Sequence, residues 1–330
     1  MNANAHVGQL GLGALLLPSQ ATPDSAADVP ISNLVDSASV LAPAEAAPDL
    51  NEIAVSSRFY PGSLNSPPPQ DLVLVTTDQV FFFVQSAVLL AASRNFFANC
   101  IIPQRLAAAA ARGQHEITCI HETSIILNIV LHAIYDFPCE QFGPTNHNLI
   151  ATVDTLAKYG LSVQTYVTSP RSLFNVLASR IATDPLQFYA LAGHHDLYAL
   201  ASRASVHLVG HKASDIPMPV AERMGPIYLN RLLALHQARQ EALKAILRAP
   251  PAPHPPTDAC GADGHAALAR AWSFVAAYLI WEMRPDMTTI SLELTVGRLS
   301  RDISCPLCKT SFHARLAEVI AAWASVPRCI

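Results

Sequence analysis

The chain has 330 residues, of which 51% are hydrophobic and 14% are charged, and its formal net charge is −4 at pH 7. This balance is typical of a globular protein. No run of five or more basic residues occurs, so we expect no nucleic-acid partner bound through its phosphates. The longest apolar stretches, Val80–Ala92 and Trp272–Trp281, are shorter than the roughly 20 residues that cross a bilayer, so we expect no membrane span.

Residues 1–69 are rich in alanine, proline, serine and aspartate, and they end in the three prolines Pro67–Pro69. This composition predicts a disordered leader. The first residues lack the cationic segment of a secretory signal. The seven cysteines are an odd number in a long chain, which indicates reduced thiols. We therefore expect an intracellular protein, cytoplasmic or nuclear.

The segment 70–165 combines strand and helix patterns. Leu72–Val75 and Val80–Val84 are short β-branched and aromatic runs separated by a four-residue turn, which predicts a β-hairpin. Apolar residues then recur at helical spacing from Ser86, and the later elements are a strand at 117–120 and helices at Ser124–Phe137 and His147–Tyr159. This order is not a βαβ repeat. It predicts the α+β class, with helices covering one sheet.

Helical patterns continue beyond that domain. They predict a helical extension over 166–248, a proline-rich spacer over 249–258 and a helical C-terminal unit over 259–330. In the helix expected at Pro226–Leu247, the basic residues Arg231, Arg239 and Lys244 are assigned to a solvated face.

Part of the first domain resembles a known family. The stretch DLVLVTTDQVFFFVQSAVLLAASRNFFA (71–98) places a hairpin before a helix of small residues and leucine, and Ser93 precedes the aromatic pair Phe96 and Phe97. The later Leu156–Gly160 ends in Ala-Lys-Tyr-Gly. Over about 71–161 the chain thus resembles a BTB/POZ domain. The helical remainder with its late Cys-x-x-Cys is similar to a fungal, basidiomycete-like group of BTB proteins with a helical C-terminal extension.

The resemblance implies a non-catalytic protein–protein interaction module that forms a homodimer. We expect the interface at the hairpin and the helix after it, through Phe81, Phe83, Val88 and Leu89. An alternative is a substrate adaptor for a cullin-type ubiquitin ligase. The sequence departs from the family pattern in two places. Gln85-Ser86 stands where many members have His-Lys, which does not support the charged peptide-binding pocket of those members. Residues 102–115 contain no glutamate, which does not support a cullin-binding motif.

Catalytic motifs offer little support for an enzyme. The sequence has no G-x-S-x-G elbow, no phosphate-binding G-x-x-x-x-G-K-[ST] loop and no H-E-x-x-H. The run His194-His195-Asp196 follows a helix, and we interpret Asp196 as the N-cap of the next one.

One cluster carries metal-binding chemistry. Cys305 and Cys308 form a C-x2-C pair, whose short turn aims both thiolates at one ion, and Cys260 is the natural third ligand. We favour His265 as the fourth ligand, with His254 and His313 as alternatives. Such a site would hold one structural zinc, because four protein ligands leave no open position for the substrate of a metal-dependent enzyme. Reduced packing thiols and a redox pair are the competing interpretations.

Overall fold

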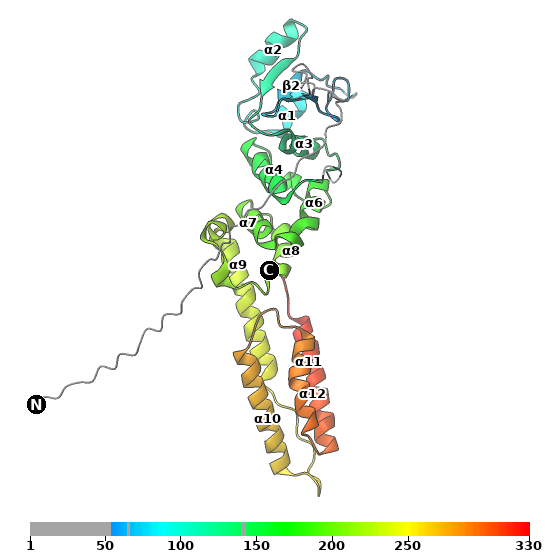
Figure 1. Cartoon of the computed structure of the whole chain (residues 1–330), viewed down its shortest axis with the longest axis vertical. Coiled ribbons are helices and arrows are strands. Elements are labelled where there is room, and N and C mark those ends of the chain that lie inside the picture. The colour runs from blue at the N-terminus through cyan, green and yellow to red at the C-terminus, as the bar shows by residue number, and fades with distance from the viewer. Residues whose placement is uncertain (1–53, 65–66, 140, 142) are drawn as a thin grey trace, which may run out of the picture. The chain divides into compact units, whose positions relative to one another are not determined.

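The computed structural model describes residues 54–64, 67–139, 141 and 143–330 (Figure 1). Its described strands form one mixed sheet in the order β1-β3-β2-β4. The predicted hairpin is β2 (Leu72–Val75) and β3 (Val80–Val84), which pair antiparallel with Val73 opposite Phe83. β4 (Glu116–Cys119) joins β2 in parallel, and β1 (Ala54–Val55) joins β3 in parallel.

The predicted disordered leader extends too far toward the C-terminus. Up to residue 53 the leader lies outside the described residues, but residues 54–64 belong to the domain. Phe59 is fully buried, and its carbonyl accepts a hydrogen bond from the Phe83 N–H at 2.8 Å. Phe59 packs in the core beside Phe82. The average composition of residues 1–69 does not reveal this buried aromatic residue.

Helices cover the sheet as the α+β class predicts. They are α1 (Ser86–Ala92), α2 (Pro103–Ala111), α3 (Ser124–Ile134) and α4 (Asn146–Lys158). Aspartates that flank the hairpin strands fix two of the helix N-termini. The Asp71 carboxylate accepts hydrogen bonds from the N–H and hydroxyl of Ser86, and the Asp78 carboxylate accepts those of Ser124. Both contacts satisfy helix N–H groups that have no partner inside the helix.

The predicted helical extension consists of α5 (Val163–Tyr166), α6 (Ser172–Arg180), α7 (Pro185–His194), α8 (Tyr198–Leu208) and α9 (Met218–Leu247). α9 contains a kink where Gly225, at φ 75°, precedes Pro226. Gly193 lets α7 approach α9 closely, because a Cβ at this position would lie 2.4 Å from the Met224 carbonyl oxygen. The core of the α+β domain continues without a break through these helices as far as Leu232.

The second half of α9 packs with α10 (Ala262–Trp281), α11 (Thr289–Gly297) and α12 (Pro306–Ser325), and we call these four the C-terminal bundle (Figure 1). Its separate core contains residues of all four helices: Leu243, Leu247, Trp272, Ala276, Leu279, Leu292, Val296, Phe312, Leu316, Val319 and Trp323. Within the described part of the chain, no helix is both long and apolar enough to cross a membrane.

The prediction that Arg239 lies on a solvated face of α9 is wrong. Its side chain is 3% exposed, and its guanidinium donates hydrogen bonds to the carbonyls of Pro285, Val326 and Pro327 at 2.7–2.9 Å. The same group lies 4.3 Å from the ring of Trp323. Arg239 therefore joins α9 to the loop before α11 and to the segment after α12.

Candidate metal centre

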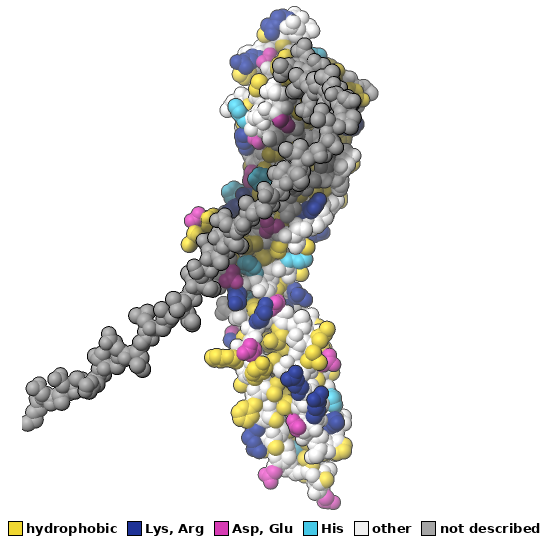
Figure 2. Space-filling view, in the orientation of Figure 1, with side chains coloured by type: hydrophobic (Ala, Val, Ile, Leu, Met, Phe, Trp, Pro, Cys, Tyr) yellow, Lys and Arg dark blue, Asp and Glu magenta, His cyan; other side chains and the backbone are white. Residues whose placement is uncertain are grey.

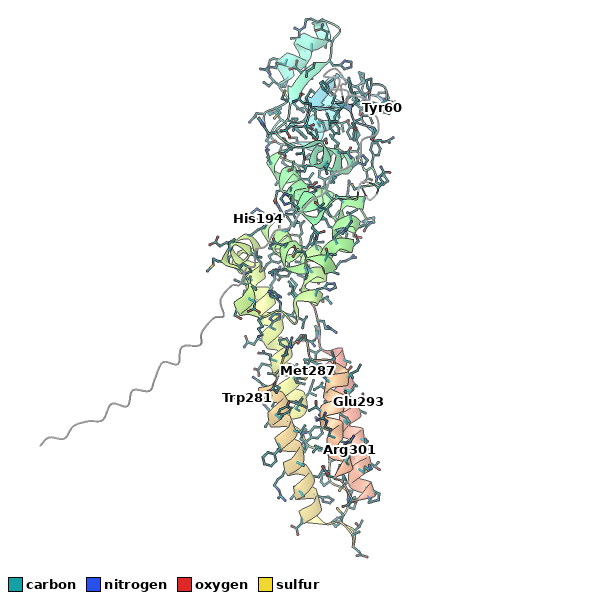
Figure 3. All side chains as sticks on the ribbon, viewed as in Figure 1. Tyr60, His194, Trp281, Met287, Glu293 and Arg301 are labelled. Atoms are coloured by element: carbon teal, nitrogen blue, oxygen red, sulfur yellow. The ribbon has the colours of Figure 1, made fainter. Side chains whose placement is uncertain are left out.

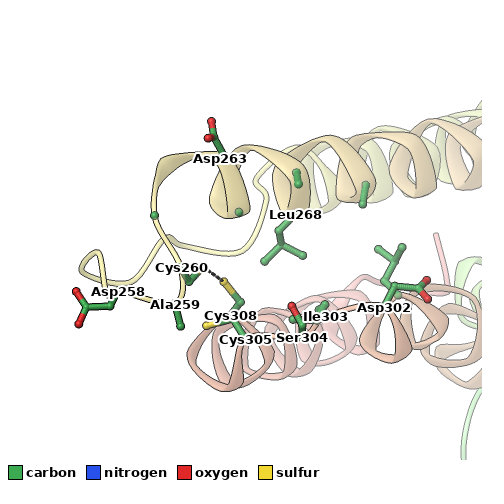
Figure 4. Close-up of a pocket in the computed structure, with 15 residues that line it drawn as sticks. Asp258, Ala259, Cys260, Asp263, Leu268, Asp302, Ile303, Ser304, Cys305 and Cys308 are labelled. Carbon is green, nitrogen blue, oxygen red and sulfur yellow. Dashed lines mark hydrogen bonds between the residues drawn. The ribbon is translucent and has the colours of Figure 1, made fainter.

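Four potential metal ligands converge at one end of the C-terminal bundle. They are His254, Cys260, Cys305 and Cys308, and their ligand atoms all lie within 4.8 Å of one another. The Sγ atoms of Cys260 and Cys308 are 3.6 Å apart, and Cys305 Sγ lies 3.3 Å from His254 Nε2. Figure 4 shows the three cysteines between the loop that precedes α10 and the start of α12. These residues could hold a metal ion.

Short-range structure places each cysteine. Thr257 and Cys260 exchange backbone hydrogen bonds of 2.9 and 3.1 Å, which close a tight turn around the thiol. Gly264 faces that thiol, since a Cβ at residue 264 would lie 2.8 Å from Cys260 Sγ. Cys305 is the N-cap of α12, and Cys308 lies in its first turn. The positive end of the helix dipole favours the thiolate form of both.

The proline-rich spacer brings the histidine back to these thiols. α12 holds the spacer along its length: Ser311 donates to the Ala252 carbonyl at 2.6 Å and Arg315 donates to the Ala249 carbonyl at 3.0 Å. His254 Nδ1 lies 2.7 Å from the Pro255 carbonyl oxygen. A proton on Nδ1 would leave the Nε2 lone pair facing Cys305, as is usual for a histidine that ligates a metal.

Two of the separations between the ligand atoms fit zinc. Tetrahedral coordination at a Zn–S distance of about 2.3 Å puts two sulfur atoms roughly 3.8 Å apart, and a sulfur and a nitrogen slightly closer. The distances of 3.6 and 3.3 Å agree with these edges to within a few tenths of an ångström. Three cysteines and one histidine form a ligand set typical of structural zinc sites.

The thiols differ in acidity. The backbone N–H groups of Cys308 and Leu307 stabilise the Cys305 thiolate and lower the pKa of this thiol to about 7. Burial raises the pKa of Cys308 to about 12. A cation between them would remove this cost of burying a thiolate, because metal binding displaces the thiol proton.

The favoured histidine differs from the one that the structure places in the group. His265, the sequence-based choice, lies behind His254, with the two ring centroids 4.4 Å apart. His313 is exposed and contacts the ring of Phe312. Spacing along the chain favoured His265 because it follows Cys260 at short range and was expected in the first turn of the next helix, facing inward. The return of the spacer along α12 is a long-range contact that spacing does not encode.

A cavity of about 560 Å³ opens beside the thiols. Asp258, Asp263 and Asp302 line it together with apolar residues of α10 (Figure 4). In Figure 4 the side chains of Asp258 and Asp263 point away from the three cysteines.

A second group of potential ligands has a different character. Asp154, His194 and His195 lie close together, but the Asp154 carboxylate accepts two hydrogen bonds from Arg223, at 2.7 and 2.9 Å, and contacts His195 at 2.8 Å. The guanidinium already neutralises this carboxylate. Asp196 is not a helix N-cap as expected: α8 begins after Leu197, and the Asp196 carboxylate accepts from the Tyr228 hydroxyl at 2.7 Å.

The residues predicted for the interface are only partly available. Phe81, Phe83 and Val88 are partly exposed, whereas Leu89 is fully buried in the core of the domain and is wrong as a contact residue. Periodicity placed Leu89 on the helix but did not distinguish the side that faces the sheet. In comparisons with family models, curated proteins and solved structures, the chain has no significant match.

Proposed function

We propose that His254, Cys260, Cys305 and Cys308 bind one structural zinc ion, and that the chain is a non-catalytic protein–protein interaction protein. The convergence of three thiols and one imidazole from segments up to 54 residues apart supports the metal site. Four protein ligands complete the coordination of zinc and leave no position for a substrate. The ion ties the spacer and the start of α10 to the start of α12.

Metal analysis of purified protein tests the site. The chain should carry about one equivalent of zinc. The double substitution Cys305→Ser and Cys308→Ser should abolish binding, and His254→Ala should weaken it at least tenfold. His265→Ala is the matched control and should keep the metal. Zinc that is lost from His265→Ala but retained by His254→Ala would overturn the ligand assignment, and zinc-free protein prepared without chelator would overturn the site.

The interaction function rests on one surface of the first domain. The outer side of α1 carries Ala87, Val88 and Ala91 and no charged side chain. With Pro68, Ile134 and Tyr166, these residues line an open apolar hollow of about 440 Å³. Such a surface is typical of a contact site. It lies in the segment that resembles a BTB/POZ domain, which supports self-association through α1 and the hairpin.

Matched alanine substitutions test this interface. Ala91 of α1 and Ala107 of α2 are both exposed, so a glutamate at either position should preserve the fold. Ala91→Glu should weaken self-association at least tenfold in sedimentation, because it buries an unpaired charge, while Ala107→Glu should not. Equal association of the two variants would exclude the α1 surface. The cullin-adaptor alternative predicts a cullin in pull-downs of the full chain.

A further inference from the structure

α10 is apolar on two opposite sides. Trp272, Ala276 and Leu279 face the core of the C-terminal bundle and are at most 9% exposed. Phe274, Tyr278 and Trp281 follow one another at spacings of four and three residues, so they form one stripe on the outer side. They are 77%, 56% and 86% exposed. A helix that is apolar on all sides is usually buried on all sides.

The outer stripe alone supplies about half of the surface that each partner contributes to a standard complex. At 150–250 Å² for each aromatic side chain, the three exposed rings present roughly 400 Å² of surface. Ile290 and Leu294 of the neighbouring α11 are about two-thirds exposed and add to the apolar surface of the bundle. Each partner in a standard complex contributes about 800 Å². Hydrophobic side chains gather over this half of the bundle in Figure 2, and Trp281 is labelled in Figure 3.

We infer that the outer face of α10 binds the same face of a second copy of this chain, with the two helices antiparallel. No charged residue lies between Arg270 and Glu282, so the face can contact itself without bringing like charges together. In an antiparallel pair, the Arg270 end of one helix lies beside the Glu282 end of the other. Neither side chain has an ion-pair partner among the described residues.

This contact is separate from the α1 surface of the proposed function, so the two can fail independently. The chain with Ala91→Glu isolates α10. If both surfaces associate, the unsubstituted chain forms assemblies larger than a dimer, and the Ala91→Glu chain forms a dimer. If only α10 associates, both form dimers.

Tryptophan fluorescence reports directly on the contact. The chain has three tryptophans, and Trp272 and Trp323 are 2% and 3% exposed, so Trp281 dominates quenching by acrylamide. As the Ala91→Glu chain is concentrated through the micromolar range, its emission should shift to the blue and the quenchable fraction should fall. Protection of Trp281 in a monomer at every concentration would overturn the inference. So would protection that requires phosphatidylcholine–phosphatidylserine vesicles or an added protein.

Substitutions identify the surface and the direction of the helices. In the Ala91→Glu background, Phe274→Ser with Trp281→Ser should raise the dimer dissociation constant at least about 100-fold, as expected for aromatic residues at the centre of an interface. The control is Met218→Ser with Ile227→Ser, which changes two apolar residues of α9 that are 71% and 65% exposed. Arg270→Glu should weaken the dimer about two- to fivefold, and adding Glu282→Arg should restore it. A dimer insensitive to the aromatic pair, or equally sensitive to the control, would overturn the inference.

Discussion

Two regions of the described chain hold their helices together in different ways. The first region, which comprises the α+β domain and the helices up to Leu232, has one large continuous core. Its fully buried side chains include the aromatic residues Phe59, Phe82, Phe97, Phe174 and Phe188. The C-terminal bundle has a much smaller core, made by about one to three turns of each helix. The difference matters because small cores supply little stability on their own.

Hydrogen bonds from buried polar side chains add to the small core of the bundle and join its helices. Arg239 joins three carbonyls, Trp272 donates to the Leu247 carbonyl at 2.9 Å, and Trp323 donates to the Met287 carbonyl at 2.7 Å. The Cys/His group closes the far end, where α10 and α12 begin. Buried polar groups of this kind specify one arrangement only when all partners are present. The bundle should therefore depend on single residues more than the first region does.

Loss of metal should produce the largest difference between the regions. Chelation, or Cys305→Ser with Cys308→Ser, should unfold or loosen the bundle and spare the first region, which contains none of the ligands. All three tryptophans lie in the bundle, so their emission reports on it alone, while circular dichroism reports on both regions. Cys329→Ser, an exposed thiol outside the group, is the control. Tryptophan emission that chelator leaves unchanged would show that the bundle does not depend on metal.

Phe59→Ala tests the opposite side of the comparison. Removing this fully buried ring should lower the free energy of unfolding of the first region by about 3–5 kcal/mol. Circular dichroism should show the loss, and the tryptophan signal of the bundle should keep its midpoint. Tyr60→Ala changes the neighbouring ring, which is 49% exposed, and should cost far less. Equal effects of the two would contradict the assignment of residues 54–64 to the domain.

Arg239→Ala should destabilise the bundle by about 3 kcal/mol, because it leaves three buried carbonyls without their donor. Arg239→Lys keeps the charge but not the planar fork, so it should recover only part of the loss. Denaturant unfolding followed by tryptophan emission measures both. Gln237→Ala, an exposed position of the same helix, is the control. Full rescue by lysine would show that charge alone matters there.

Local patterns predicted much of this architecture. The two apolar runs around Thr76–Gln79 predicted the hairpin because a short turn and β-branched residues act over a few positions. Helical patterns predicted that the extension is helical, but they anticipated neither the short α5 nor the first turns of α9. α2 was not anticipated: PQRLAAAAA is a strong helix former, but its alanines carry no apolar period.

Long-range contacts account for what the sequence did not reveal. C-x2-C spacing pointed to Cys305 and Cys308, with Cys260 as the natural third ligand, whereas His254 is brought in by the packing of the spacer on α12. Arg239 occupies a helix position compatible with solvent, and its burial depends on the segments after α10 and α12. Two residues of β1 are too few to show a pattern, and only pairing with β3 defines them.

The smallest effect should come from Asp154, where α4 meets α7 and α9 in the first region. Burial opposes the charge of this carboxylate, but hydrogen bonds from His195 and Arg223 outweigh it and hold its pKa below the ordinary 3.8. A lowered pKa in the folded state stabilises the fold above the unfolded value, and this stabilisation is lost as pH falls through the folded one. Asp154→Asn should therefore cost at most about 1 kcal/mol near neutral pH, because the side chain is 40% exposed. The cost should shrink below about pH 4.

Urea unfolding at pH 7 and pH 3, followed by circular dichroism, measures the cost of Asp154→Asn. The control is Asp136→Asn, which removes a more exposed ion pair. A loss of several kcal/mol would mean that the first region also depends on polar ties, and the contrast with the bundle would not hold.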